Sequence, residues 1–146
     1  MMKTKISNAV GLWAVMLGLI VSGCGKEKPA PIDPHSPSGV NLAIQALEAP
    51  LSQALKTNDL QFIHKQMYYI ETVADTLAFE TQRDQKLSPE QKQRVADLLV
   101  KLKQVAQDTD NSSGRNHQDS TAENLQRLFA VFKELDAELA PKPGQK

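Results

Sequence analysis

The segment that decides the fold is residues 60–77, which read LQFIHKQMYYIETVADTL. Apolar side chains recur in it at steps of three and four residues, which places them on one face of a helix. This stripe consists of Leu60, Ile63, Met67, Ile70, Ala74 and Leu77. A short helix with one apolar face is stable mainly through packing of that face, so the segment predicts helical partners elsewhere in the chain.

Three other segments show the same spacing and predict helices on either side of the one over residues 60–83. The first covers about residues 40–57, where Pro50 predicts a kink or break near 48–50, since proline interrupts helical hydrogen bonding. The third begins at the capping box Ser88-Pro89-Glu90-Gln91. The fourth begins at a second capping box, Ser120-Thr121-Ala122-Glu123, after a polar loop over 108–119.

The apolar stripes of these three helices are Val40, Ile44, Leu47, Leu51 and Leu55; Val95, Leu98, Leu99, Leu102, Val105 and Ala106; and Leu125, Leu128, Phe132, Leu135 and Leu139. No segment alternates with the period of two that a half-buried strand shows. Four amphipathic helices with short connections predict an all-α fold, an antiparallel four-helix bundle.

The first residues predict an export signal. Lys3 and Lys5 precede an apolar run over residues 9–21, and a basic start followed by an apolar core of this length is typical of a secretory signal peptide. The run is shorter than the roughly 20 apolar residues that span a bilayer comfortably. It ends at Val21-Ser22-Gly23-Cys24.

This ending resembles the lipobox of bacterial lipoproteins, in which small residues precede a cysteine. The resemblance implies that Cys24 receives a diacylglycerol, that residues 1–23 are removed, and that the new amino group is acylated. Lipidation also explains a single cysteine in an exported chain, where a free thiol is exposed to oxidation. Gly25 follows the cysteine, and in lipoproteins of the enteric type a residue other than aspartate there implies the outer membrane. We therefore expect a periplasm-facing, lipid-anchored protein in a Gram-negative host.

The expected organisation is a signal peptide over 1–23, the lipidated cysteine and a proline-rich linker over 24–38, a helical bundle over 39–140, and a disordered tail over 141–146. The linker contains Pro29, Pro31, Pro34 and Pro37. Extended at roughly 3.1 Å per residue, such a tether reaches about 40 Å. It would separate the lipid from the folded domain.

Composition excludes several classes of function. The chain has 17 Lys and Arg and 17 Asp and Glu side chains, and loss of the two leader lysines leaves the mature chain near a net charge of −2. The absence of a basic patch argues against nucleic acid as a partner. One cysteine permits no disulfide, redox pair or covalent haem attachment. No nucleophile motif or glycine-rich phosphate loop is present, so we expect neither an enzyme nor a cofactor.

His64, Met67 and Glu71 are the candidate metal ligands, because spacings of three and four residues place them along one side of a helix. Histidine with methionine can bind copper, and histidine with carboxylates can bind zinc or nickel. The structural alternative is a boundary histidine that bonds to Tyr68 or Glu71 while Met67 packs in the core. One helix supplies few ligands, and His35 and His117 lie outside the predicted helices.

Two other ligand sites are weaker hypotheses. Soluble b-type cytochromes share the four-helix topology, but their haem ligands lie on the first and last helices, which here carry neither His nor Met. The segment 108–119 is similar to a calcium loop, which alternates oxygen ligands and ends with an acidic side chain. Its glycine stands one position late, at Gly114, and it ends in Asp119 rather than glutamate. A solvated polar turn is the simpler interpretation.

Residues 60–71 are also similar to a segment of small exported four-helix proteins of unknown function, which carry a comparable Ile-His, Tyr and aliphatic-Glu run. The resemblance covers the second helix only. It implies a helical bundle and supplies no activity. We therefore expect a non-enzymatic interaction or accessory module that contacts the membrane through Cys24 and binds an envelope protein. The alternative is a metal-handling protein that uses His64 and Met67.

Overall fold

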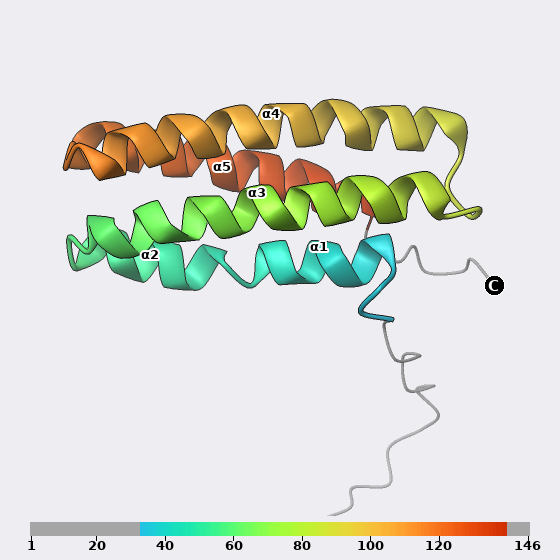
Figure 1. The fold of residues 1–146 in the computed structure, drawn as a ribbon, viewed down its shortest axis with the longest axis horizontal. Helices are drawn as coiled ribbons and strands as arrows, with labels where there is room; N and C mark the ends of the chain where they lie inside the picture. Colours follow the sequence, from blue (N-terminus) through green and yellow to red (C-terminus); the bar gives the residue numbers. More distant parts are fainter. Residues whose placement is uncertain (1–32, 140–146) are drawn as a thin grey trace, which may run out of the picture. The chain divides into compact units, whose positions relative to one another are not determined.

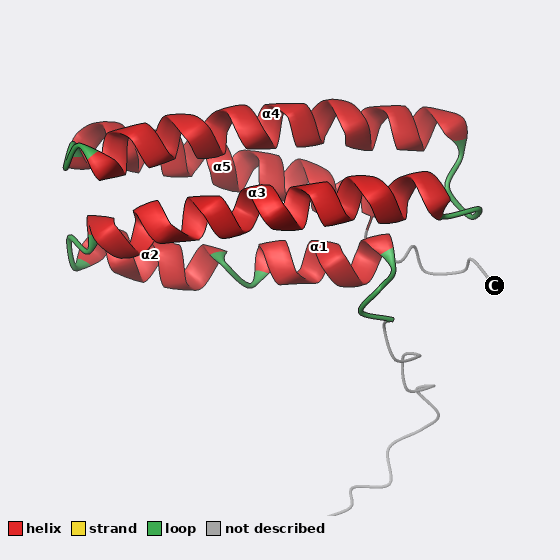
Figure 2. Cartoon of the chain, viewed as in Figure 1, coloured by secondary structure: helices red, strands yellow, loops and turns green. Residues whose placement is uncertain are grey.

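The structure, a computed structural model, describes residues 33–139, and all regular elements in this part of the chain are α-helices (Figures 1 and 2). They are α1 (Pro37–Gln45), α2 (Glu48–Lys56), α3 (Leu60–Arg83), α4 (Pro89–Gly114) and α5 (Gln118–Leu139). α1 and α2 are two pieces of the first predicted helix. Together with α3, α4 and α5 they form a helical bundle in which the helices pack against each other. The all-helical prediction is confirmed.

The predicted break in the first helix is confirmed, two residues before the expected position. Ala46 and Leu47 separate α1 from α2, and Pro50 is the third residue of α2. The first turn of a helix has no intrahelical acceptor for its N–H groups, so the missing N–H of Pro50 costs no hydrogen bond there.

The start of α1 corrects the predicted domain boundary. The helix begins at Pro37, inside the predicted linker, because Ser36 caps it by accepting a hydrogen bond from the Gly39 amide at 3.1 Å. Proline at the first helical position has its φ angle already set for a helix. The fourth proline of the linker therefore starts the folded domain.

The turns that follow α2 and α4 lie at the same end of the bundle (Figure 1), and each contains an asparagine. Asn58 follows α2 and Asn116 follows α4, with φ angles of 56° and 58° in the left-handed region. The amide after each asparagine bonds back to the helix, as Asp59 N does to Ala54 O at 2.8 Å and His117 N to Ser112 O at 2.9 Å. This is the Schellman ending, for which asparagine serves when glycine is absent.

The core consists mainly of the predicted stripes, to which Ala54 and Val73 are added. Every apolar position of the α3 stripe is buried, and Ile63, Met67 and Ile70 have no exposed surface. Leu47, Leu55, Leu98 and Phe129 are only half-buried and pack against the edge of the core. Six polar residues are buried as well, and four of them lie on α4 or at the start of α5: Asn41, Thr81, Thr109, Ser112, Ser113 and Thr121.

The capping box at the start of α4 is confirmed, with Ser88 Oγ accepting from Gln91 N and Gln91 Oε1 accepting from Ser88 N. The pKa of Glu90 in this first turn is lowered by its own backbone N–H and by the Ser88 hydroxyl. One turn later, the hydrogen bond to Glu138 raises the pKa of Arg94. The Arg94 pair with Glu138 joins the start of α4 to the end of α5.

The predicted signal peptide, Cys24 and most of the linker lie outside the described residues, as does the predicted tail over 141–146. Among the helices of residues 33–139, none has the length and apolar character that a membrane span requires.

A matched pair of valine substitutions on α4 tests the core. Val105 is 2% exposed and Val100 is 71% exposed. Val105→Ala should lower the free energy of unfolding by about 2 kcal/mol, because it removes two buried carbon groups and leaves a cavity. Val100→Ala makes the same chemical change in solvent and should stay within about 0.5 kcal/mol of wild type. Urea unfolding followed by circular dichroism measures both; equal losses would contradict this core.

Candidate functional site

His64 lies against the last turns of α4. Its Nδ1 is 2.7 Å from Asp110 Oδ1, yet that nitrogen is buried without a hydrogen bond of acceptable geometry. The contact is therefore an ion pair when the imidazole is protonated, with the carboxylate off the direction of the ring N–H. Gly114 is close as well, since a Cβ there would lie 3.3 Å from Nδ1. His64 thus packs α3 onto the end of α4.

An open hollow of about 410 Å³ surrounds this contact, lined by His64, Lys65, Tyr68, Glu71 and Asp110. The structure brings His64 and Glu71 of the predicted metal set to the same hollow and adds Asp110, which lies 46 positions away in sequence. Met67 does not join them, because its side chain is fully buried in the core. Among residues 33–139 no three His, Cys, Asp or Glu side chains are close enough to hold a metal ion.

The predicted polar loop over 108–119 is wrong, because α4 continues to Gly114 and α5 begins at Gln118. Its hydroxyl side chains fit a helix by bonding back to the preceding turn: Thr109 Oγ1 donates to Val105 O and Ser113 Oγ to Thr109 O, both at 2.7 Å. A helix cannot wrap its own side chains around an ion as a calcium loop does. The calcium-loop hypothesis fails for this reason.

The capping box predicted at Ser120 is also wrong. Thr121 already lies inside α5 and is fully buried. Its hydroxyl is 2.8 Å from His117 O and 3.1 Å from Ser112 Oγ. The small polar side chains therefore form a seam between α4 and α5 rather than a solvated turn.

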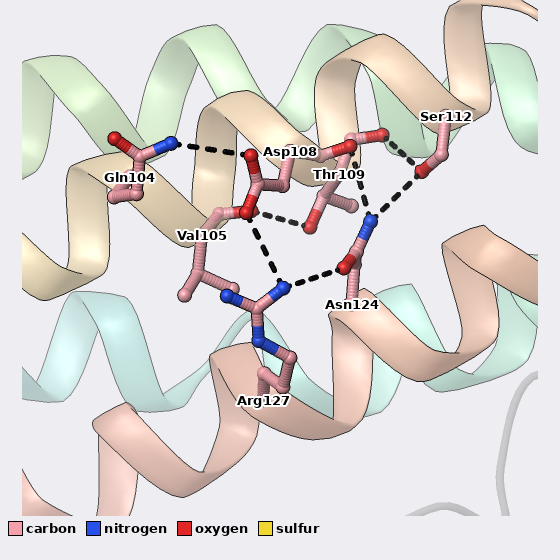
Figure 3. A network of polar contacts seen from close by, with 7 residues as sticks. All are labelled: Gln104, Val105, Asp108, Thr109, Ser112, Asn124 and Arg127. Carbon is pink, nitrogen blue, oxygen red and sulfur yellow. Dashed lines mark hydrogen bonds and ion pairs between the residues drawn. The ribbon is translucent and has the colours of Figure 1, made fainter.

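Asn124 and Arg127 of α5 extend this seam to the surface (Figure 3). Asn124 Nδ2 donates to Asp108 O at 3.1 Å and lies 3.4 Å from Ser112 Oγ. Arg127 Nη1 donates to Asn124 Oδ1 at 2.9 Å and lies 3.3 Å from Asp108 Oδ2. Asp108 also accepts a hydrogen bond from Gln104 at 3.2 Å. The network fixes the guanidinium of Arg127 at the protein surface.

A second hollow, of about 330 Å³, opens beside this network at the turn between α4 and α5. All of its lining residues are polar: Asp108, Asn111, Ser112, Arg115, His117, Ser120, Asn124 and Arg127. Arg115 and His117 are exposed, and Ser112 at the base is 7% exposed. The hollow therefore combines a rigid polar base with cationic side chains at its rim.

Sequence reasoning missed this second hollow because it placed 108–119 in a loop. The available signal was the spacing of Thr109, Ser112 and Ser113, which continues the α4 stripe after Val105 and Ala106. A search for apolar residues alone cannot detect a buried helix face made of small hydroxyl side chains.

A comparison of the chain with protein-family models, with curated proteins and with solved structures finds no match. The site is therefore interpreted from its own geometry.

The seam predicts an effect of Asn124→Ala on stability. This substitution removes the donor that joins α5 to Asp108 O and Ser112 Oγ, so the free energy of unfolding should fall by about 1 kcal/mol. Gln126→Ala removes an exposed amide from the same helix and should change it by less than about 0.5 kcal/mol. Thermal or urea unfolding distinguishes the two variants, and an Asn124→Ala protein as stable as Gln126→Ala would show that the seam contributes nothing.

The metal hypothesis has its own test. Because Met67 lies in the core, we expect equimolar zinc or copper to leave the melting temperature of wild type and of His64→Gln unchanged. His117→Gln serves as the matched control, since it removes an exposed histidine outside the His64 hollow. A metal-dependent rise in melting temperature, lost in His64→Gln and retained in His117→Gln, would establish a metal site by linkage.

Proposed function

We propose that this chain is a lipid-anchored envelope protein whose helical bundle acts as a non-enzymatic interaction module. The anchor would be the lipid on Cys24, within the lipobox-like Val21-Ser22-Gly23-Cys24. More than one acyl chain on that cysteine gives stable attachment, since each buried methylene contributes about 0.8 kcal/mol. The proline-rich residues that follow the cysteine would hold the bundle away from the bilayer.

We also propose that the consecutive pair α1 and α2, counted as one rod, forms an antiparallel up-down-up-down bundle with α3, α4 and α5. Three contacts between α4 and α5 support this direction, because residue numbers rise along one helix as they fall along the other. The contacts are Arg94 with Glu138 at 2.9 Å, Lys101 with Glu134 at 2.9 Å, and Asp108 with Arg127 at 3.3 Å. The same criterion supports an antiparallel α3 and α4. Asp75 pairs with Lys103 and His64 contacts Asp110, so residue numbers again rise along one helix as they fall along the other.

The observation that carries the proposal is the meeting of the two ends of the folded domain. Ser38 Oγ in the first turn of α1 donates to Leu139 O at the end of α5, at 2.6 Å. The chain therefore enters and leaves the bundle at one end (Figure 1). The opposite end carries the turns at Asn58 and Asn116. An anchor before α1 would attach the bundle through the end where the chain enters and leaves it, so the polar hollow lies at the end remote from the attachment.

The proposed location is the periplasmic face of the outer membrane in a Gram-negative host, with an envelope protein as the partner. Gly25 after the cysteine supports this location by resemblance to enteric lipoproteins. The near-neutral charge of the chain supports a protein partner rather than a nucleic acid.

Cys24→Ser tests the anchor. The hydroxyl cannot replace the thiol as acyl acceptor, so the variant should incorporate no radiolabelled palmitate and should keep residues 1–23. Ser22→Ala preserves a small residue before the cysteine and should label and mature as wild type does. Gly25→Asp should retain the label but fractionate with the inner membrane. Normal labelling and processing of Cys24→Ser would overturn the proposed anchor.

A further inference from the structure

We propose that the polar hollow at the turn between α4 and α5 binds an oxyanion, the negatively charged oxygens of a phosphate or a carboxylate. Its rim carries Arg115, His117 and Arg127, and its only acidic lining residue is Asp108. The inference concerns the end of the bundle opposite to the start of α1. It does not depend on the lipid anchor.

Arg127 is held at the edge of the hollow by contacts with its neighbours. Both of its described contacts, to Asn124 and to Asp108, use Nη1, as Figure 3 shows. Within residues 33–139, Nη2 and Nε have no acceptor. A guanidinium N–H group can donate to an oxygen of a carboxylate or phosphate, and Arg127 lines the hollow. A guanidinium already fixed by the network loses little conformational freedom on binding.

The charge of the hollow favours an anion. Asp108 is occupied by Arg127 and by the Gln104 amide, so its carboxylate is paired within the network. Arg115 and the side chain of His117 are exposed and have no ion pair with the described residues. Two arginines against one aspartate leave an excess of one positive charge.

The base of the hollow gives the site its shape. Ser112 Oγ donates to Thr109 O at 3.0 Å and lies within 3.4 Å of the Thr121 hydroxyl and the Asn124 amide. These contacts hold α4 and α5 together beneath the rim. Asn111 and Ser120 add an amide and a hydroxyl that can donate to an oxyanion.

Titration of the purified full chain in detergent, followed by NMR of the arginine Nε–H groups, tests the proposal. Sodium phosphate and sodium acetate are added in separate arms at constant ionic strength, with sodium chloride as the reference. We expect saturable shifts of the Arg115 and Arg127 resonances with phosphate, acetate or both, and none with chloride. The stronger of the two arms identifies the oxyanion that the hollow prefers.

Arg115→Gln is the principal variant, because Arg115 makes no ion pair with a described residue and its loss should leave the fold intact. It should weaken binding at least about tenfold, the scale of one charged hydrogen bond. Arg83→Gln makes the same change on α3, where Arg83 packs over the Phe79 ring at 5.0 Å, and should bind as wild type does. Arg127→Gln, with folding checked by circular dichroism, should abolish the saturable shifts.

Shifts that do not saturate in either arm, or that chloride reproduces, would overturn the proposal. Equal affinity in Arg115→Gln and Arg83→Gln would do the same, because it would reduce the effect to the overall charge of the protein.

Discussion

The structure depends on burial of the apolar face of α3. Ile63, Met67 and Ile70 are fully enclosed, and their enclosure requires helices on both sides of α3. Contacts of α3 with α4 and with the α1–α2 rod provide it, while α5 closes the remaining side through α4 and α1. Because most of the stability of a helix in a protein comes from packing of its apolar face, α3 depends on the helices around it.

The second half of α4 packs through small polar side chains instead of apolar ones. The apolar stripe ends near Ala106, and the following turns bury Thr109, Ser112 and Ser113 instead. Small side chains allow close packing, and their hydroxyls need partners once buried. Bonds back to α4 and across to Thr121 and Asn124 satisfy them. The polar network at the surface is thus a consequence of how α4 and α5 pack, and it fixes the guanidinium on which oxyanion binding would rest.

The two ends of the bundle differ in chemistry. At one end, the Ser38 contact with Leu139 and the Arg94 pair with Glu138 close the domain where the chain enters and leaves it. The other end contains the two Schellman turns and the polar hollow lined by Arg115, His117 and Arg127. The hollow therefore lies at the end of the bundle that is remote from the point where the chain enters and leaves it.

The sequence by itself determined the helical class, the bounds of α3, the capping box at Ser88 and nearly all of the apolar core. These features are local or periodic, so neighbouring residues suffice to predict them. The sequence also supplies the proposed anchor at Cys24, which lies outside the described residues. The polar composition of residues 108–119 predicts a loop, so the sequence misplaces the end of α4 and the start of α5. Only the tertiary structure placed Asp110 against His64, and burial of Met67 in the core decided between the two interpretations that the sequence left open. It also assembled Asp108, Asn124 and Arg127 into one network, since such contacts join residues on different helices and depend on how those helices face each other.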